Sequence, residues 1–184
     1  MLLLVLGVPL LTVALLLRVR QGNPVLFRQE RIGLQGEPFD ILKFRTMRPA
    51  QTGDARVTSG EEDDRITAIG AILRRHRLDE FPQLWNVLRG DMSLVGPRPE
   101  VPQFVDHSQD VWQTVLSVRP GITGPDALQF RNEGADLAQS KDPEAHYRDV
   151  ILPAKLQVQA DYARHRSLVG DVRILFRTLG TLRG

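Results

Sequence analysis

Residues 67–100 read TAIGAILRRHRLDEFPQLWNVLRGDMSLVGPRPE, and this stretch places a pair of acids between two short helical patterns. Apolar residues at helical spacing predict one helix over 67–77 and another over 81–88, with Pro82 in the first turn of the second. Three prolines and a glycine then predict an irregular segment over 91–102. Short helices joined by irregular segments indicate an α/β fold that is mostly helical.

The sequence on either side adds a few strands and further helices. Alternating side chains predict strands, clusters of Pro and Gly predict turns, and amphipathic spacing predicts helices. The expected elements are strands over 25–28 and 39–47, an exposed acidic loop over 49–64, a helix over 104–116, a rigid turn over 119–125, a long helix capped by Ser140 or Asp142 that ends near Arg164, and an amphipathic helix over 167–182. We therefore expect no large regular sheet.

The composition indicates one domain of 184 residues with balanced charge. The 24 basic and 22 acidic side chains give a net charge of +2, which excludes a general nucleic-acid binder because such proteins carry a strong basic excess. The chain has no cysteine, so it has no disulfide, thiolate metal site or thiol nucleophile. This usage fits a reducing compartment.

The first residues, 1–17, read MLLLVLGVPLLTVALLL and carry no charged side chain. As a helix they would rise about 25 Å, which is short of the ~30 Å hydrocarbon core of a bilayer. Pro9 lacks a backbone N–H and Gly7 lacks a side chain, so we expect a kink in the middle of this run. Arg18 and Arg20 would anchor the far end at a membrane surface.

Four interpretations of the apolar run remain open: a signal peptide, a full membrane span, a buried core helix, and a proline-broken helix that enters and leaves the membrane on one face. A signal peptide would need a basic start and a small-residue cleavage site, and neither is present. Residues 18–48 carry seven basic and three acidic side chains, and residues 166–184 carry four and one. Because anionic lipids attract such segments, we favour the re-entrant helix at a cytoplasmic membrane face.

The adjacent acids Asp79 and Glu80 are the leading candidates for chemistry. They follow the basic run 74–77, and carboxylates beside cations can hold Mg²⁺ and a phosphate-bearing substrate together. A carboxylate can also act as a nucleophile on phosphorus. The alternative is structural, because acids in a first helical turn also interact favourably with the helix dipole.

Four further cations are candidates for binding phosphate. Lys43 and Arg45 share one face of the predicted strand over 39–47, where they could bind a pyrophosphate. Arg98 lies between two prolines that restrict its backbone, which suits a guanidinium that grips phosphate. Arg119 begins another rigid turn. For each of them, a solvated or structural side chain is the alternative.

Three stretches of the sequence resemble the bacterial sugar transferase family, whose small members are the monotopic phosphoglycosyl transferases. They are KFRTM (43–47), LDEFPQLWNVLRGDMSLVGPRPE (78–100) and VRPGITG (118–124). The similarity extends over nearly the whole chain from about Pro9. It implies a membrane helix over 1–20, re-entrant at Pro9, followed by a catalytic domain over 21–184 on the cytoplasmic face of the bacterial inner membrane, with amphipathic helices at the interface.

The resemblance implies transfer of a sugar-1-phosphate from a UDP-sugar to undecaprenyl phosphate, with release of UMP, as the first membrane step of bacterial glycoconjugate synthesis. It assigns Asp79 as the nucleophile and Mg²⁺ ligand, and Glu80 as the partner that positions or deprotonates. Arg74 and Arg98 match family arginines, and the resemblance implies that Arg98 binds phosphate. Residues 125–128, PDAL, depart from the common Trp-containing pattern, so the sugar stays open.

A second hypothesis is a catalytically silent membrane adaptor that recruits other glycan-assembly enzymes. The intact acid pair and the accompanying cations Lys43, Arg74 and Arg98 argue against it. The amphipathic surfaces would also allow a homodimer.

Overall fold

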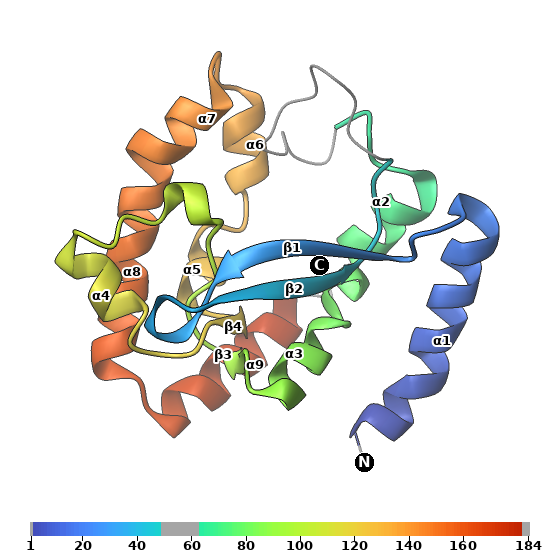
Figure 1. Cartoon of the computed structure of the whole chain (residues 1–184), viewed down its shortest axis with the longest axis horizontal. Helices are drawn as coiled ribbons and strands as arrows, with labels where there is room; N and C mark the ends of the chain where they lie inside the picture. Colours follow the sequence, from blue (N-terminus) through green and yellow to red (C-terminus); the bar gives the residue numbers. More distant parts are fainter. Residues whose placement is uncertain (1, 49–62, 182–184) are drawn as a thin grey trace.

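The computed structural model describes residues 2–48 and 63–181, with side chains from Gly7 onward (Figure 1). Two small sheets lie among helices and short helical turns. This agrees with the predicted fold, which is mostly helical and has no large regular sheet. The strands are β1 (Leu26–Ile32), β2 (Pro38–Phe44), β3 (Ser93–Val95) and β4 (Gly121–Thr123). The helices are α1 (Leu2–Gln21), α2 (Ala68–Arg75), α3 (Gln83–Arg89), α4 (Asp110–Val115), α5 (Pro125–Gln129), α6 (Glu133–Ala138), α7 (Pro143–His146), α8 (Leu152–His165) and α9 (Leu168–Thr181). The shorter turns are η1 (Leu34–Gly36), η3 (Leu78–Glu80), η4 (Pro102–Phe104) and the π-helical η5 (Tyr147–Ile151).

Strands β1 and β2 form an antiparallel ribbon across the middle of the molecule (Figure 1). Their register runs from Leu26 opposite Phe44 to Ile32 opposite Pro38. Both strands were predicted, although β1 extends four residues beyond the predicted 25–28 and β2 ends three residues before 47. Most of the predicted acidic loop, 49–64, lies outside the described residues.

The second sheet was not predicted. Strands β3 and β4 pair in parallel, with Ser93 opposite Gly121 and Val95 opposite Thr123. The two backbones approach so closely that a Cβ on Gly121 would lie 2.1 Å from the backbone nitrogen of Gly96. Glycine is therefore required here, and it allows the turn over 119–125 to pack against the segment that contains Arg98.

The predicted helix over 104–116 is only partly correct, because η4 and α4 are separate. The Asp106 carboxylate accepts hydrogen bonds from the backbone and hydroxyl of Ser108 and from the amide of Gln109. Such local side-chain bonds compete with helix formation. The turn therefore delays the start of the helix to Asp110.

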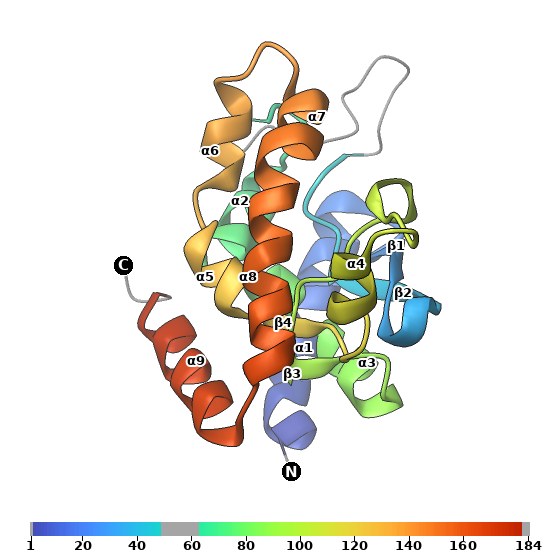
Figure 2. The same ribbon diagram turned by 90° about the vertical axis from the view of Figure 1, so that its left-hand side faces the viewer.

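The long helical segment predicted from Ser140 or Asp142 is confirmed as α7, η5 and α8, which run in succession (Figure 2). Of the two candidate caps, Asp142 accepts a hydrogen bond from the backbone of Ala145 at 3.0 Å. This segment and α4 enclose the main apolar core. Its buried members include Trp112, Leu116, Ile151, Leu156 and Ala160.

Helix α1 is continuous from Leu2 to Gln21 and runs through Pro9. The two arms expected from a proline break are therefore not seen. Leu17 is buried in a second cluster with Phe44 and Leu73, which joins α1 to the ribbon and to α2. Among the residues that the structure describes, no helix is long and apolar enough to cross a membrane.

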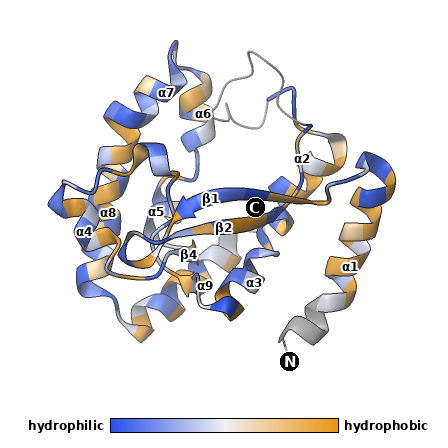
Figure 3. Ribbon diagram, in the orientation of Figure 1, coloured by the Kyte–Doolittle hydropathy of each residue, from blue (hydrophilic) through white to orange (hydrophobic). Residues whose placement is uncertain are grey.

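Several helices expose apolar side chains, which colour α1 orange over much of its length (Figure 3). The predicted amphipathic helix over 167–182 is confirmed as α9, and α3 also exposes large apolar side chains. The exposed residues on these three helices include Val8, Leu11, Leu15, Val19, Trp85, Leu88, Leu168, Val169, Phe176 and Leu179. Exposed apolar side chains in such numbers are typical of proteins that contact lipid or another protein.

Candidate active site

The acid pair lies in η3, a tight turn between α2 and α3. Helix α2 ends at Arg75, and Arg77 then adopts a left-handed conformation with a φ of 53°. This backbone reversal starts the new turn that carries Asp79 and Glu80 against the end of β2. The geometry thus brings the acids to Lys43, the penultimate residue of that strand.

Glu80 is buried at the centre of a cluster of cations. One of its oxygens, Oε1, accepts from Lys43 Nζ at 2.9 Å and from Arg98 Nη2 at 2.8 Å. Arg77 approaches the other oxygen at 3.9 Å. Burial alone would raise the pKa of Glu80, but Arg98 and Lys43, through their charges and hydrogen bonds, hold it well below its usual range. Glu80 therefore stays ionised and anchors both cations.

Asp79 differs sharply from its neighbour. Its carboxylate is half-buried and forms no hydrogen bond or ion pair with another residue in the described part of the chain. Burial and the adjacent charge of Glu80 raise the pKa of Asp79, against the opposing charges of nearby cations, among them Lys43. Asp79 is thus a carboxylate that is free to react, beside cations that the other acid holds in place.

Two buried polar side chains, Asp126 and Gln159, hold the backbone of Arg98 in place. Its N–H donates to Asp126 Oδ2 at 3.1 Å, and its carbonyl accepts from Gln159 Nε2 at 3.2 Å. Gln159 also donates to the same Asp126 oxygen at 2.6 Å. Asp126 is fully buried and Gln159 nearly so. Helices α5 and α8 therefore hold the turn between Pro97 and Pro99 that presents the Arg98 guanidinium.

A second polar group fixes the far end of this turn. Arg31 donates to the carbonyl of Pro99 at 3.1 Å and pairs with Glu100 at 3.4 Å. The hydroxyl of Tyr147 donates to Glu100 and accepts from Lys155 at 3.3 Å. Sequence reasoning missed these supporting residues and those beneath Arg98. They are separated along the chain by tens of residues, so no local pattern groups them.

We expect Asp126→Ala to destabilise the fold by about 2–4 kcal/mol, because the N–H of Arg98 and the amide of Gln159 would lose a buried acceptor. Asp126→Asn keeps one oxygen that can accept from both Arg98 and Gln159. Its NH₂ would replace Oδ1, which has no hydrogen-bond partner, so the loss of stability should be much smaller. Urea unfolding of the two variants measures the difference. Equal losses in both would contradict the role given to the shared oxygen.

The remaining predicted cations lie in different places. The charge of Arg74 acts on Asp79, and its guanidinium lies 3.7 Å from the sulfur of Met47, so Arg74 belongs to the surroundings of the acid pair. Arg119 instead donates to the carbonyl of Gly90 at 2.8 Å.

Arg45 follows β2 and turns toward the end of α1. Its guanidinium donates to the carbonyls of Gln21, Gly22 and Asn23, with 3.0 Å to Asn23. It caps the chain reversal after α1, and the structure does not bring it to the acid pair. Its predicted phosphate contact, like that of Arg119, stays a prediction.

The described residues contain no group of three or more His, Asp or Glu side chains that could hold a metal ion by themselves. In the acid pair, Glu80 is already paired with cations, whereas Asp79 offers free carboxylate oxygens. Magnesium is commonly held by one or two carboxylates together with substrate phosphates and water. Asp79 and a bound diphosphate therefore suit Mg²⁺, in a site that substrate would complete.

Comparison with known proteins shows sustained similarity over the chain. A UDP-glucose:undecaprenyl-phosphate glucose-1-phosphate transferase of Caulobacter vibrioides is 37% identical over 94% of this chain and 62% of its own length. A UDP-N-acetylgalactosamine-undecaprenyl-phosphate N-acetylgalactosaminephosphotransferase of Aeromonas hydrophila is 34% identical over 94% and 38%, respectively. The exopolysaccharide production protein ExoY of Sinorhizobium fredii is 32% identical over 89% and 72%.

The chain spans from about two fifths to about seven tenths of the length of these three relatives. The family model described as bacterial sugar transferase matches residues 1–183, which include the cluster around Glu80 and the free Asp79 carboxylate. The chain therefore belongs to the bacterial sugar transferase family.

Proposed function

We propose that this protein transfers a sugar-1-phosphate from a UDP-sugar to undecaprenyl phosphate and releases UMP, as an initiating step of exopolysaccharide or related glycoconjugate synthesis. One observation carries the proposal. The Asp79 carboxylate, which has no partner in residues 2–48 and 63–181, lies near Lys43 and Arg98, and Glu80 holds both of these cations through one oxygen. Relatives are named for this transfer with glucose or N-acetylgalactosamine, so both sugars are candidate donors.

In the first step, an Asp79 carboxylate oxygen attacks the phosphorus next to the sugar. A bond forms between that oxygen and phosphorus, and the bond from phosphorus to the bridging oxygen breaks. UMP leaves with the bridging oxygen, and the sugar phosphate stays on Asp79 as an acyl phosphate. Lys43 and Arg98 offset the charge that builds up on the phosphoryl oxygens.

In the second step, a phosphate oxygen of undecaprenyl phosphate attacks the same phosphorus. The new bond gives a lipid diphosphate sugar, and the bond to Asp79 breaks, which restores the carboxylate. Two anionic reactants must meet in each step, so anchored cations are needed throughout. Mg²⁺, bound by Asp79 and the substrate diphosphate, would supply Lewis-acid charge neutralisation.

We assign Glu80 a positioning role in this reaction. Its pKa is held well below the usual range, so it is a weak proton acceptor near neutral pH. It instead keeps the Lys43 ammonium and the Arg98 guanidinium in contact with one oxygen. This arrangement supports positioning over deprotonation, the two roles that the family resemblance leaves open.

We propose that the protein works at the cytoplasmic face of the bacterial inner membrane. The exposed apolar side chains of α1, α3 and α9 would enter the lipid, and Arg18 and Arg20 would stay at its surface. In the membrane, α1 would bend at Pro9 and return to the same face. The chain lacks cysteine, so a single cysteine introduced at position 2 can be tested with a thiol reagent applied from the cytoplasmic or the periplasmic side. We expect labelling from the cytoplasmic side. Labelling only from the periplasm would show a full span.

The test is release of UMP by purified protein with undecaprenyl phosphate, Mg²⁺ and a panel of UDP-sugars. Release that requires lipid, metal and one particular donor would establish the activity and identify the sugar. Binding of a UDP-sugar without turnover would overturn the proposal and favour a silent membrane adaptor.

The pH dependence of kcat/KM should report the environment of Asp79. Asp79 must be ionised to attack and its pKa is raised, so kcat/KM should fall tenfold per pH unit below a midpoint that lies above the usual carboxyl value of about 3.9. Glu80 stays ionised and should add no second step. A profile from pH 4 to 8 measures this, and a rate that is flat down to pH 4 would contradict it.

A further inference from the structure

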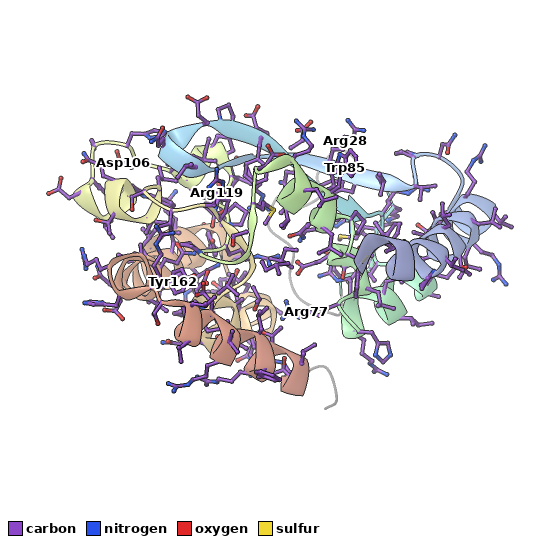
Figure 4. The ribbon with its side chains drawn as sticks, turned by 90° about the horizontal axis from the view of Figure 1, so that it is seen from below. Arg28, Arg77, Trp85, Asp106, Arg119 and Tyr162 are labelled. Carbon is purple, nitrogen blue, oxygen red and sulfur yellow. The ribbon has the colours of Figure 1, made fainter. Side chains whose placement is uncertain are left out.

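A second polar feature of the molecule takes no part in the reaction just described. It is a cavity of about 360 Å³. Its lining contains none of the residues assigned to the reaction, which are Lys43, Asp79, Glu80 and Arg98. Arg119 and Tyr162 both line this cavity, whereas Arg77 lies near Glu80; all three are labelled in Figure 4. The polar residues that line the cavity are Gln35, Ser93, Ser117, Arg119, Tyr162, Arg166 and Asp171.

The cavity offers donors and a positive charge. Within the described residues, Arg119 forms a hydrogen bond only through its Nε, to the carbonyl of Gly90, so its Nη groups are available to a ligand. Arg166 has no hydrogen bond or ion pair within the described part of the chain. The single acid, Asp171, accepts from Tyr162 at 2.8 Å. Two guanidinium groups against one carboxylate leave a net positive site, which suits a phosphate group.

The backbone at the cavity is also unusual. Gln35 lies in its wall with a φ of 57°, and the one other non-glycine residue of the described chain with a positive φ is Arg77, beside the acid pair. Such conformations are unfavourable for residues with a side chain and concentrate at functional sites. The hydrogen bond from the Gln35 N–H to the carbonyl of Leu116, at 2.7 Å, holds this turn in place.

Exposed apolar side chains adjoin the polar lining along the chain. Leu94 lies between two residues of the wall, and Leu168 and Val169 follow Arg166 at the start of α9. Their exposed fractions are 41%, 80% and 71%. A cationic cavity whose lining residues are adjacent in the chain to exposed apolar residues suits a ligand with a phosphate head and hydrocarbon tails, because both parts find suitable surroundings.

We propose that this cavity binds the head group of an anionic phospholipid. The phosphate would contact Arg119 and Arg166, while the acyl chains lie along the exposed start of α9. The site would fix the depth and rotation of the catalytic domain at the membrane. This inference rests on the proposed membrane function, but the cavity is separate from the acid pair.

Native mass spectrometry of the full chain in neutral detergent tests the proposal, with equimolar dioleoylphosphatidylglycerol and dioleoylphosphatidylcholine as probes. We expect one retained phosphatidylglycerol per chain and at least tenfold less phosphatidylcholine. The double variant Arg119→Gln with Arg166→Gln should lose at least tenfold of the bound lipid. The control, Arg173→Gln with Arg177→Gln, removes the same charge from α9 outside the cavity and should change retention less than twofold.

Equal losses in the two double variants would show diffuse charge attraction and overturn the proposal. Equal retention of both lipids would overturn it too. Displacement of the lipid by millimolar inorganic phosphate would show that the cavity takes the free anion. The same measurement on Asp79→Asn should give wild-type retention, so it can succeed or fail independently of transferase activity, and circular dichroism confirms that each variant is folded.

Discussion

Asp79→Asn should lower turnover by at least about a thousandfold while the protein remains folded. The amide has almost the same volume as the carboxylate but cannot form the acyl phosphate. Because Asp79 has no hydrogen bond or ion pair within the described chain, its replacement leaves no partner unsatisfied. Burial also disfavours the charged form of Asp79, and a neutral amide avoids this cost. The free energy of unfolding of the variant should therefore be at least as large as that of the parent protein.

Two measurements on Asp79→Asn separate chemistry from folding. UMP release gives the turnover, and urea unfolding gives the stability. Asp136→Asn, at an exposed position of α6, is the matched control and should retain full activity. Wild-type turnover in Asp79→Asn would remove Asp79 as the nucleophile, and the reaction would then need direct attack by the lipid phosphate.

Glu80→Gln should reduce both activity and stability. The neutral side chain would leave Lys43 and Arg98 without their shared counter-charge in a partly buried site. We expect a loss of about 2 kcal/mol in the free energy of unfolding, since removal of one partner leaves the others uncompensated. The displaced cations would also lower turnover by about a hundredfold, as small errors of position do in other enzymes.

A double-mutant cycle tests this coupling. Lys43→Gln combined with Glu80→Gln removes both members of one ion pair, so the double variant should be more stable than the sum of the single losses implies. Glu30→Gln, on the exposed side of β1 and without an ion pair in the described chain, should be neutral. Additive losses in the cycle would show that Lys43 and Glu80 act independently.

The effect should also depend on pH in a defined direction. The folded pKa of Glu80 is lowered, so its ion pairs contribute fully above the unfolded value of about 4.3 and are lost as pH falls below it. The parent protein should therefore lose stability on acidification in this window, and Glu80→Gln should lose less of it. Parallel curves for the two proteins would contradict the charge cluster.

The sequence predicted most helices and the first ribbon because their signals are local. Helical spacing located α2, α3 and α9 to within a few residues, and alternation located β2. The pairing of β3 with β4 escaped prediction because each has three residues, too few for a visible period, and both lie among prolines and glycines. Their position depends on contact between segments that no local pattern relates.

The candidate site divides in the same way. Asp79, Glu80, Lys43 and Arg98 were all selected from the sequence, and the structure brings them together. The unequal environments of the two acids were not predictable, because Glu80 lies 37 residues from one cation and 18 from the other. Arg45 was placed with Lys43 by strand alternation, yet β2 ends before it and nearby carbonyls bind its guanidinium.

The close approach of Gly96 to Gly121 also constrains how new donor specificities can be engineered. We expect that the segment after Gly121 cannot be exchanged by itself, because a shift of its backbone would clash with the backbone of the segment that carries Arg98. A chimera that imports residues 118–128 from a relative should fold only if residues 93–100 come with it. The two segments pack as a single unit, so we expect loop swaps that ignore this pairing to destabilise the fold.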